Sequence, residues 1–209
     1  MTDDAPQGSE AWSRARLGKL TASRMSDALA RTKTGWGASR KNYMAELIIE
    51  RLTGVPSDSY INDAMKFGIE TEPQARSAYE FHYDVEVEKV GFIDHPKMPM
   101  AGASPDGLVG KDGLVEIKCP NSATHLDTLL NGTIPDKYIV QMQFQMAVTD
   151  RQWCDFISFD PRLPERMRLW VKRIDRDPSR INMLDHEGRQ FLREVDEAMA
   201  GLTKAYGPV

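Results

Sequence analysis

The chain has 209 residues, of which 41% are hydrophobic and 28% are charged, and this balance fits one globular domain with a real core and excludes a disordered chain. The formal net charge of −4 gives no overall sign of a nucleic-acid-binding protein, so such a contact would have to come from a local patch. Two cysteines and four histidines cannot supply tetrahedral zinc spacing. We expect a protein of the reducing cytoplasm without a membrane span, because the N-terminus carries no apolar signal segment and no long apolar run is present.

Short helices are predicted at the N-terminal end. Residues 1–8 are polar, and we expect them to be loose. Ser9 offers an N-cap to a helix that stops at Gly18. Residues 21–23, Thr-Ala-Ser, then open a second short helix with one apolar face.

A basic, glycine-punctuated loop from Arg31 to Arg40 carries the aromatic Trp36. It suits contact with a nucleic-acid backbone or a base, and it suits a solvated loop equally well. Ser39 is expected to cap the next helix, whose apolar residues recur at helical spacing until Gly54 closes it. That helix belongs to the core.

Residues 62–83 predict a long helix. Pro73 should bend or restart this helix, because it lacks an N–H donor and crowds the preceding turn. Residues 85–93 alternate between apolar and polar, which predicts a strand that leads into the next segment.

The segment 104–120, SPDGLVGKDGLVEIKCP, places acidic and basic groups at a spacing that ordinary packing does not require. The turn residues 110–113 between apolar pairs predict a β-hairpin of two antiparallel strands. Side chains alternate along the second strand, so Leu114, Glu116 and Lys118 share one face and the residues between them point to the other. An acid and a base therefore lie side by side.

Asp106 lies about as far before this turn as Glu116 lies after it, so strand pairing brings the two carboxylates together. Two such carboxylates repel each other unless a cation lies between them. Oxygen ligands with room for water and a phosphate oxygen suit Mg²⁺ or Mn²⁺ rather than zinc, and Lys118 would stabilise the charge that builds up on a phosphate. These residues predict a phosphodiester-cleaving site. The alternative that they leave open is a surface hairpin with a solvated Glu116–Lys118 ion pair.

The C-terminal part alternates between helices and strands. Residues 135–148 predict a helix with Gln141 and Gln145 on a face apart from its apolar stripe. Residues 153–159 and 167–174 predict two strands, and a long C-terminal helix follows whose polar face would serve an oligomer. These elements predict an α/β fold with a central mixed sheet of about five strands flanked by helices.

The Pro-Asp pair at 105–106 and the Glu-Ile-Lys triplet at 116–118 resemble the PD-(D/E)xK nuclease superfamily, in the version of phage lambda exonuclease and YqaJ-type viral recombinase nucleases. The resemblance extends over nearly the whole chain and implies a single nuclease domain over residues 1–209. It implies Asp106, Glu116 and Lys118 as catalytic residues and Mg²⁺ as the cofactor, for which Mn²⁺ substitutes. Among the metal ligands it implies Asp106, Glu116 and Ile117.

The pattern Gly-x-x-x-Glu from Gly68 to Glu72 resembles the helix with which this family sends one more acidic side chain to the metals. The resemblance therefore implies Glu72 as a further catalytic and metal-binding residue, with Glu70 as the local competitor. A favourable acid in the first turn of a helix that restarts at Pro73 is the alternative that the residues themselves leave open.

The segment 14–23, Arg-Ala-Arg-Leu-Gly-Lys-Leu-Thr-Ala-Ser, is similar to the part of the family that binds a terminal phosphate, and residues 138–143 resemble its Gln-x-Gln helix. Arginine offers a fork of donors and a helix N-terminus offers free N–H groups, which both suit phosphate. A surface arginine and an ordinary N-cap serine are the alternatives. The resemblance implies a 5′-phosphate pocket formed by Arg16, Ser23, Ser104 and Gln141.

The function that the resemblance implies is a Mg²⁺-dependent 5′-to-3′ exonuclease that digests one strand of linear double-stranded DNA with 5′-phosphorylated ends. It further implies a ring-shaped homotrimer and a single-strand annealing protein as partner in phage-type recombination, in the cytoplasm of a bacterial host. The same carboxylates and lysine would also serve a structure-specific or restriction-type endonuclease. A non-catalytic DNA-end-binding module is the third reading.

Overall fold

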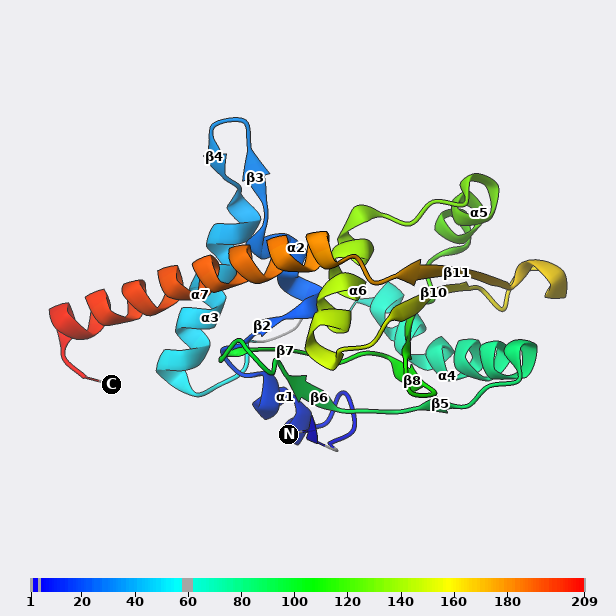
Figure 1. The fold of residues 1–209 in the computed structure, drawn as a ribbon, viewed down its shortest axis with the longest axis horizontal. Coiled ribbons are helices and arrows are strands. Elements are labelled where there is room, and N and C mark those ends of the chain that lie inside the picture. The colour runs from blue at the N-terminus through cyan, green and yellow to red at the C-terminus, as the bar shows by residue number, and fades with distance from the viewer. Residues whose placement is uncertain (1, 4, 58–61, 209) are drawn as a thin grey trace.

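A five-stranded mixed sheet organises the larger part of the fold (Figure 1). The computed structural model describes residues 2–3, 5–57 and 62–208. The strands of this sheet are β5 (Val87–Glu88), β8 (Gly107–Val109), β9 (Gly113–Lys118), β10 (Trp153–Phe159) and β11 (Leu169–Asp175). Their order is β11-β10-β9-β8-β5, in which β9 and β10 run parallel and all other neighbours run antiparallel. The predicted α/β class with a mixed sheet of about five strands is confirmed.

The predicted hairpin is formed by β8 and β9, in which Gly107 lies opposite Val115. Gly110 in the turn has a φ of +51°, a conformation that glycine adopts without steric cost. Gly113 begins β9 against the indole ring of Trp153, and a Cβ at this position would lie 2.1 Å from that ring. The turn therefore requires glycine at both ends for different reasons.

The two faces of β9 pack into different hydrophobic clusters, as the alternation predicts. Val115 and Ile117 pack with Tyr79, whereas Leu114 packs with Met142. The helices that supply these contacts and the connection to β10 are α4 (Asp63–Tyr83), α5 (Ser122–Asn131) and α6 (Asp136–Thr149).

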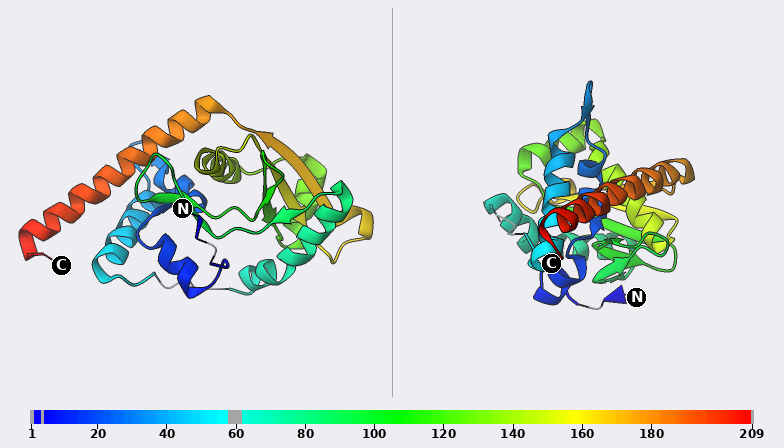
Figure 2. Two further views of the ribbon diagram at one scale, coloured as in Figure 1. Left: turned by 60° about the horizontal axis from the view of Figure 1, so that its bottom comes forward. Right: turned by 90° about the vertical axis from the view of Figure 1, so that its left-hand side faces the viewer.

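The helix α6 is buried around most of its circumference, since every residue from 142 to 148 is buried. It contacts β10 of the large sheet, and it also packs against α2 (Met25–Ala28) and α7 (Pro178–Tyr206). In the left view of Figure 2, α6 is seen nearly end-on between α7 and the strands. The helix therefore joins the two halves of the core.

A smaller sheet covers the other side of α6, with the order β1-β6-β7-β2. Its strands are β1 (Thr2–Asp3), β2 (Leu20–Thr21), β6 (Phe92–Asp94) and β7 (Ala101–Ala103). The prediction of one strand over residues 85–93 is wrong, because β5 pairs with β8 in the large sheet while β6 pairs with β7 in the small one. The chain crosses between the sheets at residues 89–91.

Part of the segment expected to be loose, residues 1–8, is paired. Thr2 and Asp3 pair with β6, and the Gln7 amide donates to the carbonyl oxygens of Val90 and Pro105 at 3.1 and 2.8 Å. Met1 and Asp4 lie outside the described residues.

The helix boundaries follow the predicted caps in part. Ser9 caps α1 (Glu10–Arg16) with its side chain, as predicted. Ser39 does not cap α3 (Ala38–Thr53), because the chain already turns at Gly37, whose N–H donates to the carbonyl oxygen of Ala30 at 2.8 Å. Gly54 ends α3 in the left-handed conformation, as predicted.

Pro73 does not restart the helix in which it lies, since α4 continues from Asp63 to Tyr83. A proline leaves the carbonyl four residues earlier without its helical donor. Here that carbonyl belongs to Ile69, whose side chain is exposed, so the freed oxygen lies on the open side of α4. The helix therefore tolerates the proline.

The basic loop forms a second hairpin, β3 (Arg31–Thr32) and β4 (Gly35–Trp36), which projects from the body (Figure 1). Trp36 is half-buried, and the guanidinium groups of Arg31 and Arg40 lie 4.1 and 3.7 Å from the centroid of its indole ring. The tryptophan is thus held by arginines instead of standing free.

The C-terminal helix α7 extends beyond the body (Figures 1 and 2). Its predicted apolar stripe is buried as far as Val195, and the helix then continues to Tyr206, whose side chain is exposed. In the described part of the chain, neither this helix nor any other is long and apolar enough to cross a membrane.

Candidate active site

The register of the β8–β9 hairpin brings Asp106 and Glu116 together. Gly107 pairs with Val115, so Asp106, which directly precedes β8, and Glu116 of β9 are the next residues outward from this pair. Directly opposed residues on antiparallel strands project to the same face. Burial and the charge of Glu116 both raise the pKa of Asp106 well above its usual range. The two acids therefore repel each other, as the spacing predicts.

Ile117 lies beside Asp106 through its backbone. Its N–H donates to Asp106 Oδ2 at 2.6 Å. The N–H and C=O of a strand residue point to the same edge, so the Ile117 carbonyl also faces the Asp106 side of β9. Two carboxylates and a backbone carbonyl are hard oxygen donors of the kind that Mg²⁺ and Mn²⁺ prefer.

Glu116 is fully buried and accepts three hydrogen bonds. Its Oε1 receives Lys118 Nζ at 2.5 Å and Gln141 Nε2 at 2.8 Å, and its Oε2 receives Gln145 Nε2 at 2.7 Å. Burial alone would lower the pKa of Lys118, but the charges of Glu116 and Asp106 outweigh this effect and raise it above the ordinary value. Lys118 is therefore a cation that partly offsets the paired acids.

Glu72 is tied to this pair through Arg76. The Arg76 guanidinium donates to Glu72 Oε1 at 2.5 Å and to the carbonyl oxygen of Asp106 at 3.1 Å. Glu72 and Asp106 line the same two clefts, whereas Glu70 is exposed and lines neither. The structure thus places Glu72, and not its competitor, beside the carboxylates.

The oxygen donors that the structure describes at this site do not form a complete metal-binding cage by themselves. In residues 2–3, 5–57 and 62–208, no three His, Cys, Asp or Glu side chains converge as a ready-made metal cage. Burial and the charge of Glu116 raise the pKa of Asp106, and a cation between the two carboxylates would relieve their repulsion. The oxygens of Asp106, Glu116 and the Ile117 carbonyl suit such an ion. In this structure the ammonium group of Lys118 is paired with Glu116.

A cavity of about 200 Å³ brings the four candidate phosphate ligands together from separate stretches of the chain. Asp106 and Lys118 lie on its wall as well, so it opens onto the carboxylates. Its candidate phosphate ligands are Arg16, Ser23, Ser104 and Gln141. Asp106 also lines two further clefts, so three hollows meet at this one residue.

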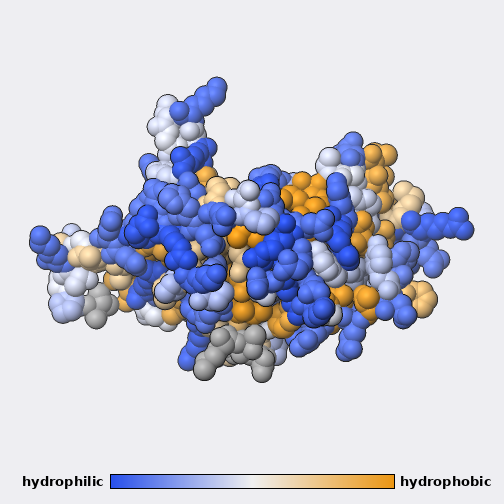
Figure 3. All heavy atoms as spheres, in the orientation of Figure 1, coloured by the Kyte–Doolittle hydropathy of each residue, from blue (hydrophilic) through white to orange (hydrophobic). Residues whose placement is uncertain are grey.

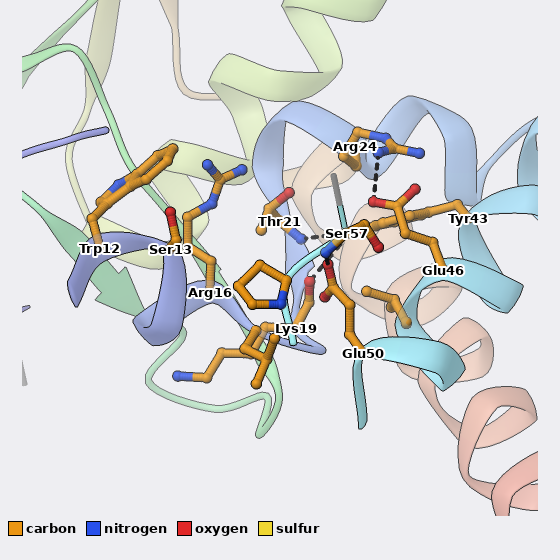
Figure 4. Close-up of a pocket in the computed structure, with 13 residues that line it drawn as sticks. Trp12, Ser13, Arg16, Lys19, Thr21, Arg24, Tyr43, Glu46, Glu50 and Ser57 are labelled. Atoms are coloured by element: carbon orange, nitrogen blue, oxygen red, sulfur yellow. Dashed lines mark hydrogen bonds and ion pairs between the residues drawn. The ribbon is translucent and has the colours of Figure 1, made fainter. Parts of the chain in front are cut away.

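Arg16 also lines a second hollow of similar volume, about 200 Å³, which is drawn in Figure 4. The carboxylates of that hollow are already engaged: Glu46 binds Arg24 at 2.9 Å, and Glu50 accepts the N–H of Gly18 at 2.7 Å. Among the described residues, the Arg16 guanidinium finds no hydrogen-bond acceptor and no ion-pair partner. It is a half-buried cation, and burial lowers its pKa.

Ser23 lies within the 3₁₀ turn η1 (Ala22–Arg24) and does not cap the helix, so the reading as an ordinary N-cap is wrong. Its Oγ lies 3.3 Å from Thr21 Oγ1.

Two contacts of the site residues follow the spacing of four residues along a helix. Trp12 precedes Arg16 by four residues on α1, and the guanidinium lies 4.0 Å from the centroid of its ring. Arg76 follows Glu72 by the same spacing, which is typical of an ion pair along a helix. Spacing alone could have suggested both contacts.

Comparison with known proteins shows the family of the chain. The family description "YqaJ-like viral recombinase domain" matches residues 11–152, more than half of the chain. Two solved structures of LHK-Exo, an alkaline exonuclease from Laribacter hongkongensis, are 50% identical to this chain and cover 94% of it and 97% of their own length. Their TM-scores are 0.89, for the complex with dAMP, and 0.88.

More distant relatives add less. A phage-related exonuclease from Haemophilus somnus 129PT is 16% identical, with a TM-score of 0.71 over 88% of this chain and 96% of its own, and shares the fold. Protein R354 of Acanthamoeba polyphaga mimivirus is 32% identical over 96 residues, which make up 38% of this chain and only 17% of that relative. The family match and the LHK-Exo structures carry the assignment: the chain belongs to the YqaJ-like viral recombinase family and is a nuclease of the alkaline exonuclease type.

Proposed function

We propose that this chain is a Mg²⁺-dependent 5′-to-3′ exonuclease that digests one strand of linear double-stranded DNA. The observation that carries the proposal is the cavity in which Arg16 and Ser104 share a wall with Asp106 and Lys118. A free guanidinium beside paired carboxylates suits an enzyme that holds a terminal phosphate while it cuts the next phosphodiester bond.

Different residues of the site have different roles in hydrolysis. Asp106, Glu116 and the Ile117 carbonyl would hold Mg²⁺, which supplies Lewis-acid activation of water when it is bound. Lys118 stabilises the charge that develops on the scissile phosphate. Arg16, with hydroxyl and amide donors from the same cavity, holds the terminal phosphate and so fixes which bond is cut.

The bond that is cleaved determines which products form. Water adds to the phosphorus, the P–O3′ bond breaks, and a proton goes to the departing 3′ oxygen. The products are a 5′-mononucleotide and a shortened strand that again begins with a 5′-phosphate, so the same cavity can bind the new end. The complex of LHK-Exo with dAMP, a deoxynucleoside monophosphate, supports this product class.

Exposed apolar side chains support the proposed homotrimer and the proposed single-strand annealing partner of phage-type recombination. Leu202 and Tyr206 lie on the part of α7 that extends beyond the body. Leu126 and Leu130 are exposed on α5, and Figure 3 shows apolar side chains gathered over this helix and the loop that leads to α6. Such surfaces mark contacts with other chains. We place the enzyme in the cytoplasm of a bacterial host.

Linear duplex compared with a covalently closed circle tests the proposal. With Mg²⁺ the linear DNA should be degraded from its 5′ ends and the circle should stay intact, and EDTA should stop the reaction. Cutting of the circle would identify an endonuclease. Binding of linear DNA ends without any cutting would identify an end-binding module.

A further inference from the structure

Two glutamines of α6, four residues apart, bind different oxygens of the same carboxylate. Gln141 Nε2 donates to Glu116 Oε1, the oxygen that Lys118 also binds. Gln145 Nε2 donates to Glu116 Oε2, on which no other donor lies among the described residues. The two ends of Glu116 therefore have separate partners.

These partners differ in how freely they can move. Gln145 is fully buried, as is Glu116, and it cannot leave Oε2 without opening the packing between α6 and β9. Gln141 is half-buried, and the Lys118 side chain is 30% exposed. Gln145 lines the same cavity as these two donors on Oε1, but only Gln141 and Lys118 are partly exposed and can exchange for another ligand. Oε2 is the fixed end of Glu116, and Oε1 is the exchangeable end.

The orientation of the Gln145 amide follows from the chemistry of its partner. An ionised carboxylate only accepts hydrogen bonds, so the NH₂ group of Gln145 must face Glu116 and its carbonyl must face away. That carbonyl oxygen, Oε1, is buried and finds no hydrogen-bond partner among the described residues. An unsatisfied buried carbonyl destabilises the fold, and an apolar residue at position 145 would avoid this cost. The hydrogen bond to Glu116, and not packing in the core, therefore explains why position 145 is a glutamine.

We propose that Gln145 is a positioning residue: it fixes Glu116 Oε2 so that Oε1 is the oxygen that passes from Lys118 to the divalent cation. The inference rests on the proposed function, because it takes Glu116 as a cation ligand. With a cation on Oε1, Lys118 would be available to the scissile phosphate and Gln141 to the terminal phosphate. Gln145 stays on Oε2 throughout and acts on the cation through Glu116.

The variant Gln145→Met removes the donor and keeps a side chain of similar length. Mn²⁺ binding, measured by calorimetry without DNA, should weaken about ten- to a hundredfold, which is the usual effect of losing a hydrogen bond that orients a metal ligand. On 5′-phosphorylated linear duplex, kcat at a fixed subsaturating Mn²⁺ concentration should fall while KM for DNA stays the same. Loss of donor function at Gln141 should instead raise KM.

Gln143 provides a matched control on the same helix. It is also buried, but its Nε2 donates to the Asp175 carbonyl oxygen at 2.8 Å and its Oε1 accepts the Asp177 N–H at 2.9 Å, away from the site. Gln143→Met should lower the melting temperature and leave the Mn²⁺ dissociation constant unchanged.

Unchanged Mn²⁺ affinity in Gln145→Met, or an equal loss in Gln143→Met, would overturn the inference. If Gln145→Met does not fold, the Mn²⁺ affinity of Gln145→Asn provides the same test, because the asparagine amide is one methylene too short to reach Glu116. A wild-type protein that binds Mn²⁺ but cuts no DNA refutes the nuclease proposal and leaves the comparison of affinities decisive. A wild-type protein that binds no Mn²⁺ refutes both.

Discussion

The indole N–H of Trp12 donates a hydrogen bond to Ser104 Oγ at 2.9 Å, which joins α1 to the residue in front of the Pro-Asp pair. The Arg16 guanidinium lies against the same indole ring. One aromatic side chain therefore orients a hydroxyl group and a cation on the wall of one cavity. These two groups lie far apart in the sequence, and the proposed binding of one terminal phosphate would give them a shared role.

Arg16→Ala should slow digestion of 5′-phosphorylated duplex by about ten- to a hundredfold, since a charge-assisted hydrogen bond contributes roughly 1.5 to 3 kcal/mol. On a 5′-hydroxyl duplex the same substitution should have much less effect, because the anion that Arg16 serves is already missing. Comparing the two substrates in both proteins isolates the interaction. If the wild type degrades both ends equally, the end is not recognised in this cavity.

Asp106→Ala and Glu116→Gln should each bring cleavage below detection while the protein stays folded, because each removes one member of a repelling pair. Cleavage assays and thermal melting of the same preparations test this. Lys118→Ala should lower kcat more than DNA affinity, as expected for a group that acts mainly in the transition state. Full activity of either carboxylate variant would remove the assignment.

The oxygen ligands predict activity with Mg²⁺ or Mn²⁺. Ca²⁺, which is larger and less exacting in geometry, should bind without turnover. Cleavage assays in each ion, paired with calorimetric binding, measure the two effects separately. A strict dependence on zinc would contradict the donor set.

Asp160 at the end of β10 predicts a pH-dependent part of the stability. Burial alone would raise its pKa, but hydrogen bonds from Arg162 and Ser122 outweigh this effect and lower it to about 2. Because the folded pKa lies below the unfolded value of about 3.9, the carboxylate contributes stability that is fully present above about pH 4 and is lost toward pH 2. Asp160→Asn should therefore lower the free energy of unfolding by about 1 to 3 kcal/mol at pH 7. The deficit should shrink on acidification.

Melting curves of the wild type and Asp160→Asn between pH 7 and about pH 2.5 provide the measurement. Asp150→Asn is the control, since that side chain is 88% exposed and asparagine tolerates the positive φ found there. Its effect should stay within about 0.5 kcal/mol at every pH. A deficit in Asp160→Asn that does not change with pH would argue against the carboxylate.

The proposed trimer predicts a mass by light scattering of about three times the 23.6 kDa of the chain. Leu202→Lys on the exposed part of α7 should reduce this mass if that surface lies in the interface. A wild-type protein that is monomeric at working concentration would rule out the ring.

The hairpin and its carboxylates could be predicted because the information is local. The turn glycines and the alternation of side chains determine which residues of β9 lie on the same face as Leu114 and which lie on the same face as Val115. The split of residues 85–93 could not be predicted, since the partners of β5 and β6 come from different sheets. Nor does any short pattern reveal the bond between Trp12 and Ser104, which is made by tertiary packing.

Because the pairing of Gly107 with Val115 positions the two acids, the geometry of the site does not depend on the length of the turn between the strands. Asp106 lies next to Glu116 because it directly precedes the last paired residue, Gly107, and Arg151 holds the turn from outside by donating to the carbonyl oxygens of Gly110 and Gly113, both at 2.8 Å. Longer connections cost little closure entropy. A relative with many more residues between its two acids could therefore keep the same site, and a search for such relatives should let this interval vary while it keeps the strand register constant.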